Sequence, residues 1–71
     1  MKPSRPFPRV GMRATVRYLA TTAGAVVERV EDDGRRLTVL TDDGRRLEFT
    51  LRLATGQYHA AGDGPRLVLE P

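Results

Sequence analysis

Apolar and polar residues alternate along most of this 71-residue chain, a pattern typical of β-strands whose two faces meet different surroundings. Every second residue from 10 to 18 is apolar, and most residues between them are basic or polar. The same period of two returns over residues 37–41, 47–53 and 66–70. Residues 25–31 are rich in β-branched valine but do not keep one parity. We therefore expect a strand there with a bulge or with both faces partly covered.

A repeated hexapeptide, Asp-Asp-Gly-Arg-Arg-Leu, occupies residues 32–37 and again residues 42–47. Asp-Gly between β-rich segments is typical of tight hairpin turns, because both residue types tolerate the positive φ that such turns require. We expect Gly34 and Gly44 to adopt positive φ. The sequence thus predicts a three-stranded meander joined by two hairpins.

The remaining segments lack this alternation. Residues 1–9 contain three prolines, which predicts an extended arm that is either a flexible lead-in or tucks Phe7 against the body. Residues 19–24 are expected to form a loop. Residues 54–65 are rich in glycine and have room only for a short helical turn over 57–61. We therefore expect an arm over residues 1–9 and one small domain over residues 10–71.

Five short strands with one apolar face each are not stable as a flat sheet, because that face would remain in water. Curling the sheet into a small barrel buries the apolar faces and removes most exposed edges. The predicted fold class is therefore all-β, a five-stranded SH3-like barrel. Its predicted core consists of the inward-facing residues Val10, Met12, Val16, Val26, Val30, Leu37, Val39, Leu47, Phe49, Leu51, Leu67 and Leu69.

The order of these elements resembles the small SH3-like barrels, including KOW- and Tudor-type modules. Residues 24–30 followed by Asp33 and Gly34 are similar to the glycine-opened strand and turn of a KOW-like segment. The resemblance implies a bacterial module of the kind found in ribosome-, RNA- or polymerase-associated proteins, or one that binds peptides. A Tudor-type aromatic cage is not expected, because the chain has only four aromatic residues and Phe49 is assigned to the core.

The amino-acid composition excludes several kinds of catalytic and metal-binding site. The chain has no cysteine, one serine (Ser4) and one histidine (His59), which excludes disulfides and thiol nucleophiles. These counts also argue against a Ser-His-Asp triad and against a multi-histidine metal site. No apolar run approaches the roughly 18 residues of a membrane span, and no signal-peptide core is present. We expect a soluble cytoplasmic protein with no membrane contact.

The net charge of +3 is unevenly distributed. Residues 1–27 hold five basic residues and no acid, whereas residues 28–71 hold seven arginines against nine acids. Such a field attracts polyanions or an acidic protein face. An alternative is codon bias in a GC-rich genome, since eleven of the twelve basic residues are arginine and isoleucine and asparagine are absent.

The strongest candidate site is the outer face of the first strand. Residues two apart on a strand share a face about 6.6–6.8 Å apart, comparable to successive phosphates of one nucleic-acid strand. Stacking surfaces for unpaired bases would come from Tyr18 and Tyr58. The alternative is that Tyr18 is a core residue and the arginines are solvated. The predicted nucleic-acid-binding residues are Arg5, Arg9, Arg13, Arg17, Tyr18 and Tyr58.

Other polar groups have simpler explanations. The two Asp-Asp pairs lack the spaced oxygen ligands of a calcium loop, and hairpin turns account for them. A lone histidine such as His59, with no nucleophile or second ligand beside it in sequence, is more often solvent-exposed than catalytic. We therefore expect no catalytic residue, no metal and no cofactor.

The sequence favours a non-enzymatic binding module that contacts the phosphate backbone of RNA or DNA through a basic face, with little base selectivity. The alternative is a protein–protein adaptor or a homo-oligomer that uses an open barrel edge or the proline-rich arm. Salt separates the two hypotheses, because phosphate contacts weaken steeply as salt rises and hydrophobic contacts do not.

Overall fold

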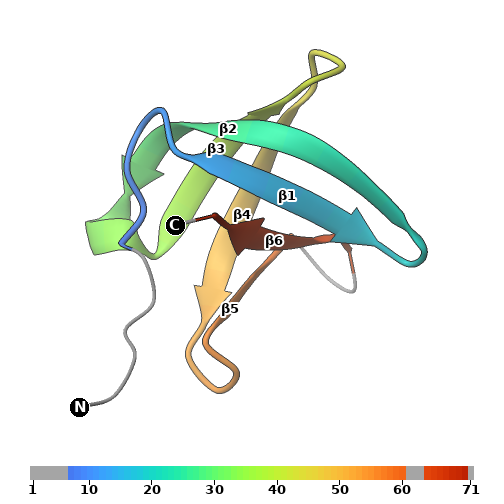
Figure 1. Ribbon diagram of the computed structural model, residues 1–71. Coiled ribbons are helices and arrows are strands. Elements are labelled where there is room, and N and C mark those ends of the chain that lie inside the picture. Colours follow the sequence, from blue (N-terminus) through green and yellow to red (C-terminus); the bar gives the residue numbers. More distant parts are fainter. Residues whose placement is uncertain (1–6, 61–63, 71) are drawn as a thin grey trace.

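The computed structural model describes residues 7–60 and 64–70, and six strands in these ranges close into an antiparallel barrel (Figure 1). Each strand pairs with the next, and the last pairs with the first. The all-β barrel prediction is confirmed, with an SH3-like topology at a coarse level and with six strands in place of five. The elements are β1 (Arg13–Tyr18), β2 (Thr21–Glu31), the 3-10 turn η1 (Asp32–Gly34), β3 (Arg36–Thr41), β4 (Arg46–Arg52), β5 (Gln57–His59) and β6 (Arg66–Leu69).

The predicted meander is present as β2, β3 and β4. The bulge expected in the valine-rich strand lies between Val27 and Arg29, where the pairing with β3 shifts register. The bulge turns Val27 into the core at 1% exposure and leaves Val30 packed against the core. The assignment of Val26 to the core was wrong. Before the bulge, Ala25 and Val27 face inward, so Val26 between them faces outward, opposite Arg13.

Two predicted boundaries around β1 were also wrong. The strand begins at Arg13, and Val10 is 67% exposed in a turn where Gly11 has a φ of 92°. At the other end, the predicted loop is a two-residue turn, after which β2 starts at Thr21. β-branched threonines suit a strand, and the Thr21 hydroxyl donates to the Tyr18 carbonyl at 2.7 Å.

The sixth strand, β5, lies where the sequence predicted room for a helical turn. It pairs with β4 on one side and with β6 on the other, so it is the element through which the barrel closes. Its central residue, Tyr58, is buried at 7% exposure and donates its hydroxyl to the Gly34 carbonyl in the first hexapeptide. This inward anchor, rather than a local period, makes residues 57–59 a strand.

The core forms between the inward faces of all six strands. Apart from Val10 and Val26, every residue predicted for the core is buried or packs against it. Two further residues that were not predicted for the core, Ala14 and Ala25, face each other across β1 and β2 and are fully buried. The buried hydrophobic residues are Ala14, Val16, Ala25, Val27, Leu37, Val39, Phe49, Tyr58 and Leu67.

Phe7 and Pro8 lead into the barrel beside the first hexapeptide. Pro8 is buried, and a Cβ atom placed on Gly34 would lie 3.2 Å from Cε1 of Phe7. Phe7 therefore contacts the body, although 60% of its surface is exposed. The described part of the chain contains no helix long and apolar enough to cross a membrane.

Candidate functional site

The outward face of β1 carries the arginines that the sequence singled out, but their surroundings differ. Arg13 Nη2 lies 3.6 Å from Asp42 Oδ2, which belongs to the turn between β3 and β4. Next along the face, the Thr15 hydroxyl donates to Glu70 Oε2 at 3.2 Å. Acidic groups thus lie beside the first half of this face. Only its far end, at Arg17, has no carboxylate partner within residues 7–60 and 64–70.

Barrel closure places a second arginine directly opposite Arg17. The register of β1 and β6 pairs Arg17 with Arg66, and the register of β5 and β6 pairs Arg66 with His59. Directly opposed residues have Cβ atoms about 4.5–5.5 Å apart. Arg52 lies on the outer face of β4, opposite Gln57 and diagonal to His59. We call Arg17, Arg52, His59 and Arg66 the cationic band.

The electrostatics of this band are unfavourable for the isolated protein, because like charges directly opposite each other destabilise a sheet. The pKa of His59 is lowered, first by desolvation and then by the positive charges of Arg52 and Arg66. Its Nε2 atom is shielded from solvent and accepts or donates no hydrogen bond within the described structure. Glu48, on the outer face of β4, shares a shallow depression with Arg52 and His59.

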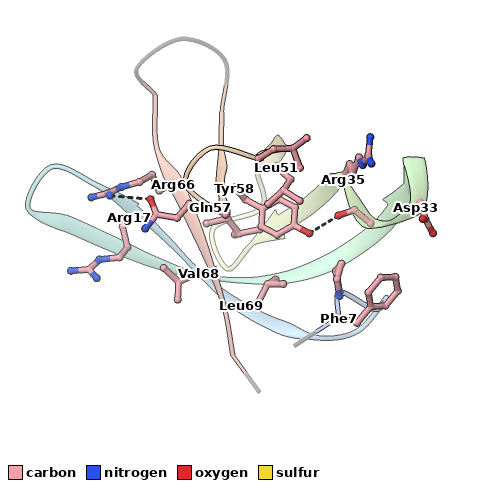
Figure 2. A pocket seen from close by; sticks show the side chains of 15 residues that line it. Phe7, Arg17, Asp33, Arg35, Leu51, Gln57, Tyr58, Arg66, Val68 and Leu69 are labelled. Carbon is pink, nitrogen blue, oxygen red and sulfur yellow. Dashed lines mark hydrogen bonds between the residues drawn. The ribbon is translucent and has the colours of Figure 1, made fainter. Parts of the chain in front are cut away.

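An open groove of about 650 Å³ adjoins the band (Figure 2). Figure 2 places Arg17, Arg66 and Gln57 at one end of the groove and Asp33 and Arg35 at the other. Between these ends the lining is mostly apolar and comes from β4, β5 and β6. The apolar residues are Leu51, Leu53, Tyr58, Leu67, Val68 and Leu69, with Phe7 and Pro8 from the lead-in.

Besides Phe7, two of these apolar side chains are exposed to solvent. Leu53 is 72% exposed and Val68 is 46% exposed. The groove arises because β6 extends past its partner: Leu67 is its last residue that pairs with β5, while Val68 and Leu69 pair with β1 alone. The Arg66 guanidinium donates to Gln57 Oε1 at 3.5 Å at the mouth of this gap.

The other predicted site residues are dispersed. Arg5 lies outside the described residues. Arg9 is exposed before β1, where its carbonyl accepts from Met12 N at 3.1 Å, and it does not line the groove. Tyr18 is 48% exposed at the end of β1. Tyr58 lines the groove, but its ring is buried at 7% exposure and its hydroxyl is bound to Gly34, so it does not offer the open stacking surface that the sequence predicted.

The sequence analysis missed Arg66, although a signal for it was present. The alternation of Leu67 and Leu69 already places Arg66 on the outer face of the last strand. The register that brings it opposite Arg17 joins residues 49 positions apart, and no local pattern specifies such pairing. Within the described ranges, no group of three or more His, Asp or Glu side chains is arranged to hold a metal ion.

Comparisons with known proteins return no relative: no protein-family model, no curated protein and no solved structure matches this chain.

Proposed function

We propose that this chain is a non-enzymatic binding module that holds the phosphate backbone of RNA or DNA on its cationic band. The observation that carries the proposal is the opposition of Arg17 and Arg66 across the seam where the barrel closes. Two like charges on directly opposed residues of a sheet are mutually destabilising, and a phosphate bound between them would offset this. Arginine is suited to this role because its donors fork onto phosphate oxygens.

The proposal revises which arginines are involved. Arg13 is already close to the Asp42 carboxylate, so a phosphate there would compete with an existing ion pair. Arg17 and Arg66 have no such competitor in the described part of the chain. Arg52 adds a third positive charge on the same face, and His59, whose pKa is lowered, becomes positive only in acid or beside a bound phosphate. We include in the proposal a KOW-like identity for residues 24–34 and a cytoplasmic location, where RNA and DNA partners are available to a bacterial module.

Salt-dependent binding tests the proposal. The Arg17→Gln/Arg66→Gln double variant should lose affinity for a short single-stranded oligonucleotide, measured by fluorescence anisotropy across a salt series. For single strands the slope of log K against log salt is about 0.7 per phosphate contact, and Arg17 and Arg66 would share one phosphate, so the double variant should flatten it by about 0.7. The matched control is Arg29→Gln/Arg45→Gln, which removes the same charge from two exposed ion pairs elsewhere. Equal losses in both double variants would contradict the proposal.

His59 provides a second readout, because it is the only histidine and lies within the band. Its pKa is lowered by desolvation and by Arg52 and Arg66, with Glu48 the nearby acid on the same outer face. A bound phosphate should raise this pKa, so that binding strengthens as pH falls through the bound-state pKa. An NMR titration of the His59 ring, with and without oligonucleotide, measures the shift directly. An unchanged titration at saturating oligonucleotide would place the ligand away from the band.

A protein contact is the second candidate function, and the exposed Leu53 and Val68 favour it. A hydrophobic contact of this kind would survive high salt, whereas phosphate binding would not. Light scattering at low and high salt, with and without oligonucleotide, distinguishes a homo-oligomer from a nucleic-acid complex.

A further inference from the structure

We propose that the groove beside the cationic band receives an unpaired base, so that the ligand is a single strand rather than a duplex. The inference rests on the proposed function, since it assigns the band to the phosphates of that strand. It concerns a different surface, however: the apolar lining of the groove, which includes the exposed Leu53 and Val68 and which the phosphate contacts do not use.

The first argument is continuity between the two surfaces. Arg17 and Arg66 belong to the band and also line one end of the groove (Figure 2). A phosphate held between them is therefore at the mouth of an apolar hollow. Gln57 lies at the same mouth, and its Oε1 atom accepts from Arg66. Its amide N–H groups are left to donate to a polar edge of whatever enters.

The second argument is the chemical character of the groove. The charged residues that line the groove are three arginines and one aspartate, so the complementary ligand is anionic, and most of the remaining lining is apolar. A nucleotide joins an anionic phosphate and a flat, largely apolar base in every unit of the chain. A peptide meets the same requirement only if its sequence sets acidic and apolar side chains at a suitable spacing.

The third argument excludes the double helix as the preferred ligand. In a duplex the base faces are stacked on each other and turned away from the backbone that the band would hold. Only a single strand can turn a base out onto Leu53 and Val68, and stacked or packed bases of this kind add affinity with little dependence on sequence. The groove volume of about 650 Å³ is ample for one base.

Abasic oligonucleotides distinguish base binding in the groove from phosphate binding on the band, because they keep every phosphate and lack every base. We expect the wild-type chain to bind a short oligothymidylate about tenfold more tightly than an abasic strand of equal length and charge. The Leu53→Ala/Val68→Ala variant should bring this ratio close to one without weakening abasic binding. The matched control is Val10→Ala/Leu19→Ala, since both side chains are strongly exposed and neither lines the groove. Circular dichroism and thermal melting establish that each variant is folded.

Each outcome has a separate meaning. Equal binding of base-bearing and abasic strands by the wild-type chain would overturn the groove inference and leave the phosphate-binding proposal in place. Failure to bind either strand at low salt would overturn both. A further arm uses an acidic peptide of alternating Glu and Leu. If Leu53→Ala/Val68→Ala weakens the peptide and leaves the base dependence unchanged, the groove is a peptide site and the inference is overturned.

Discussion

The two copies of Asp-Asp-Gly-Arg-Arg-Leu have the same sequence and different structures. In the first copy, η1, three consecutive residues adopt positive φ: Asp32 at 53°, Asp33 at 57° and Gly34 at 88°. In the second copy only Gly44 does so, at 91°, and Gly44 N donates to the Thr41 carbonyl at 2.9 Å in the short hairpin loop between β3 and β4. Identical residues thus close two neighbouring hairpins of one barrel by different turns.

The surroundings of each copy account for the difference. Gly34 is buried beneath Phe7, its carbonyl accepts the Tyr58 hydroxyl, and the following Arg35 carbonyl accepts from Leu51 N at 2.7 Å. These partners are far away in the sequence. The second copy has one distant backbone contact, from Asp42 N to the Gly24 carbonyl at 2.9 Å. Its loop is otherwise closed by the preceding residue, Thr41, whose buried hydroxyl accepts from Arg45 N at 2.9 Å and donates to the Asp43 carboxylate.

The comparison also bears on the proposed site. Asp33, Gly34 and Arg35 of the first copy form one end of the groove. Asp42 of the second copy instead lies beside Arg13 and reduces the positive charge at the start of β1. The same hexapeptide therefore lines the groove at one position and supplies a counter-charge to Arg13 at the other.

Of the changes proposed here, valine substitutions at Gly34 and Gly44 should give the largest difference in stability between the two turns. Gly34→Val adds a β-branched side chain at positive φ, with Cβ 3.2 Å from the Phe7 ring, so we expect a loss of about 2–5 kcal/mol in the free energy of unfolding. Gly44→Val carries only the conformational strain, because nothing lies within 4 Å of its Cβ, and should cost about 1–2 kcal/mol. Urea unfolding of both variants measures the difference. Equal losses would mean that the two turns are alike in solution.

The long-range anchor of the first copy gives the next largest effect. Tyr58→Phe keeps the buried ring and removes the donor to the Gly34 carbonyl, which should cost about 1–3 kcal/mol because a buried acceptor loses its partner. The matched control is Tyr18→Phe, whose ring is half exposed and whose stability should change by less than about 0.5 kcal/mol. Thermal melting at neutral pH compares them. If both variants melt together, the hydroxyl does not hold the first turn.

The features that depend on neighbouring residues in the chain could be predicted from the sequence. Alternation over residues 36–41 and 46–52 specifies which side chains face inward, and Asp-Gly specifies where the strands reverse. The bulge near Glu28 could also be predicted, because valines on both parities cannot share one face of a regular strand. These features depend on neighbours in the chain.

What the sequence did not provide depends on pairing between distant residues. The strand β5 has only three residues and no period of its own, and it exists because Tyr58 reaches Gly34, 24 positions earlier. The opposition of Arg17 and Arg66 follows from the register of β1 against β6. One residue of the candidate site, Arg17, could therefore be predicted from its position on the outer face of β1. Its partner, Arg66, could be identified only from the closed barrel.

The smallest expected effect is on the loss of stability in acid, and it tests the side-chain contacts within the second hexapeptide turn. The pKa of Asp43 is lowered, chiefly by the hydrogen bond from Thr41 and further by the charge of Arg45. Because the folded-state pKa lies below the unfolded value, this carboxylate stabilises the barrel above the unfolded pKa, and the contribution is lost as pH falls through the folded pKa.

Asp43→Asn should therefore flatten the acid limb of stability, measured by urea unfolding at a series of pH values from neutral to strongly acidic. Thr41→Val should flatten the same limb and also lower stability at neutral pH, because Arg45 N loses its acceptor. In the double variant the two effects on the acid limb should not add, since both remove one interaction. Additive effects would mean that Thr41 and Asp43 act separately and that the hydrogen bond between them is not what lowers the pKa of Asp43.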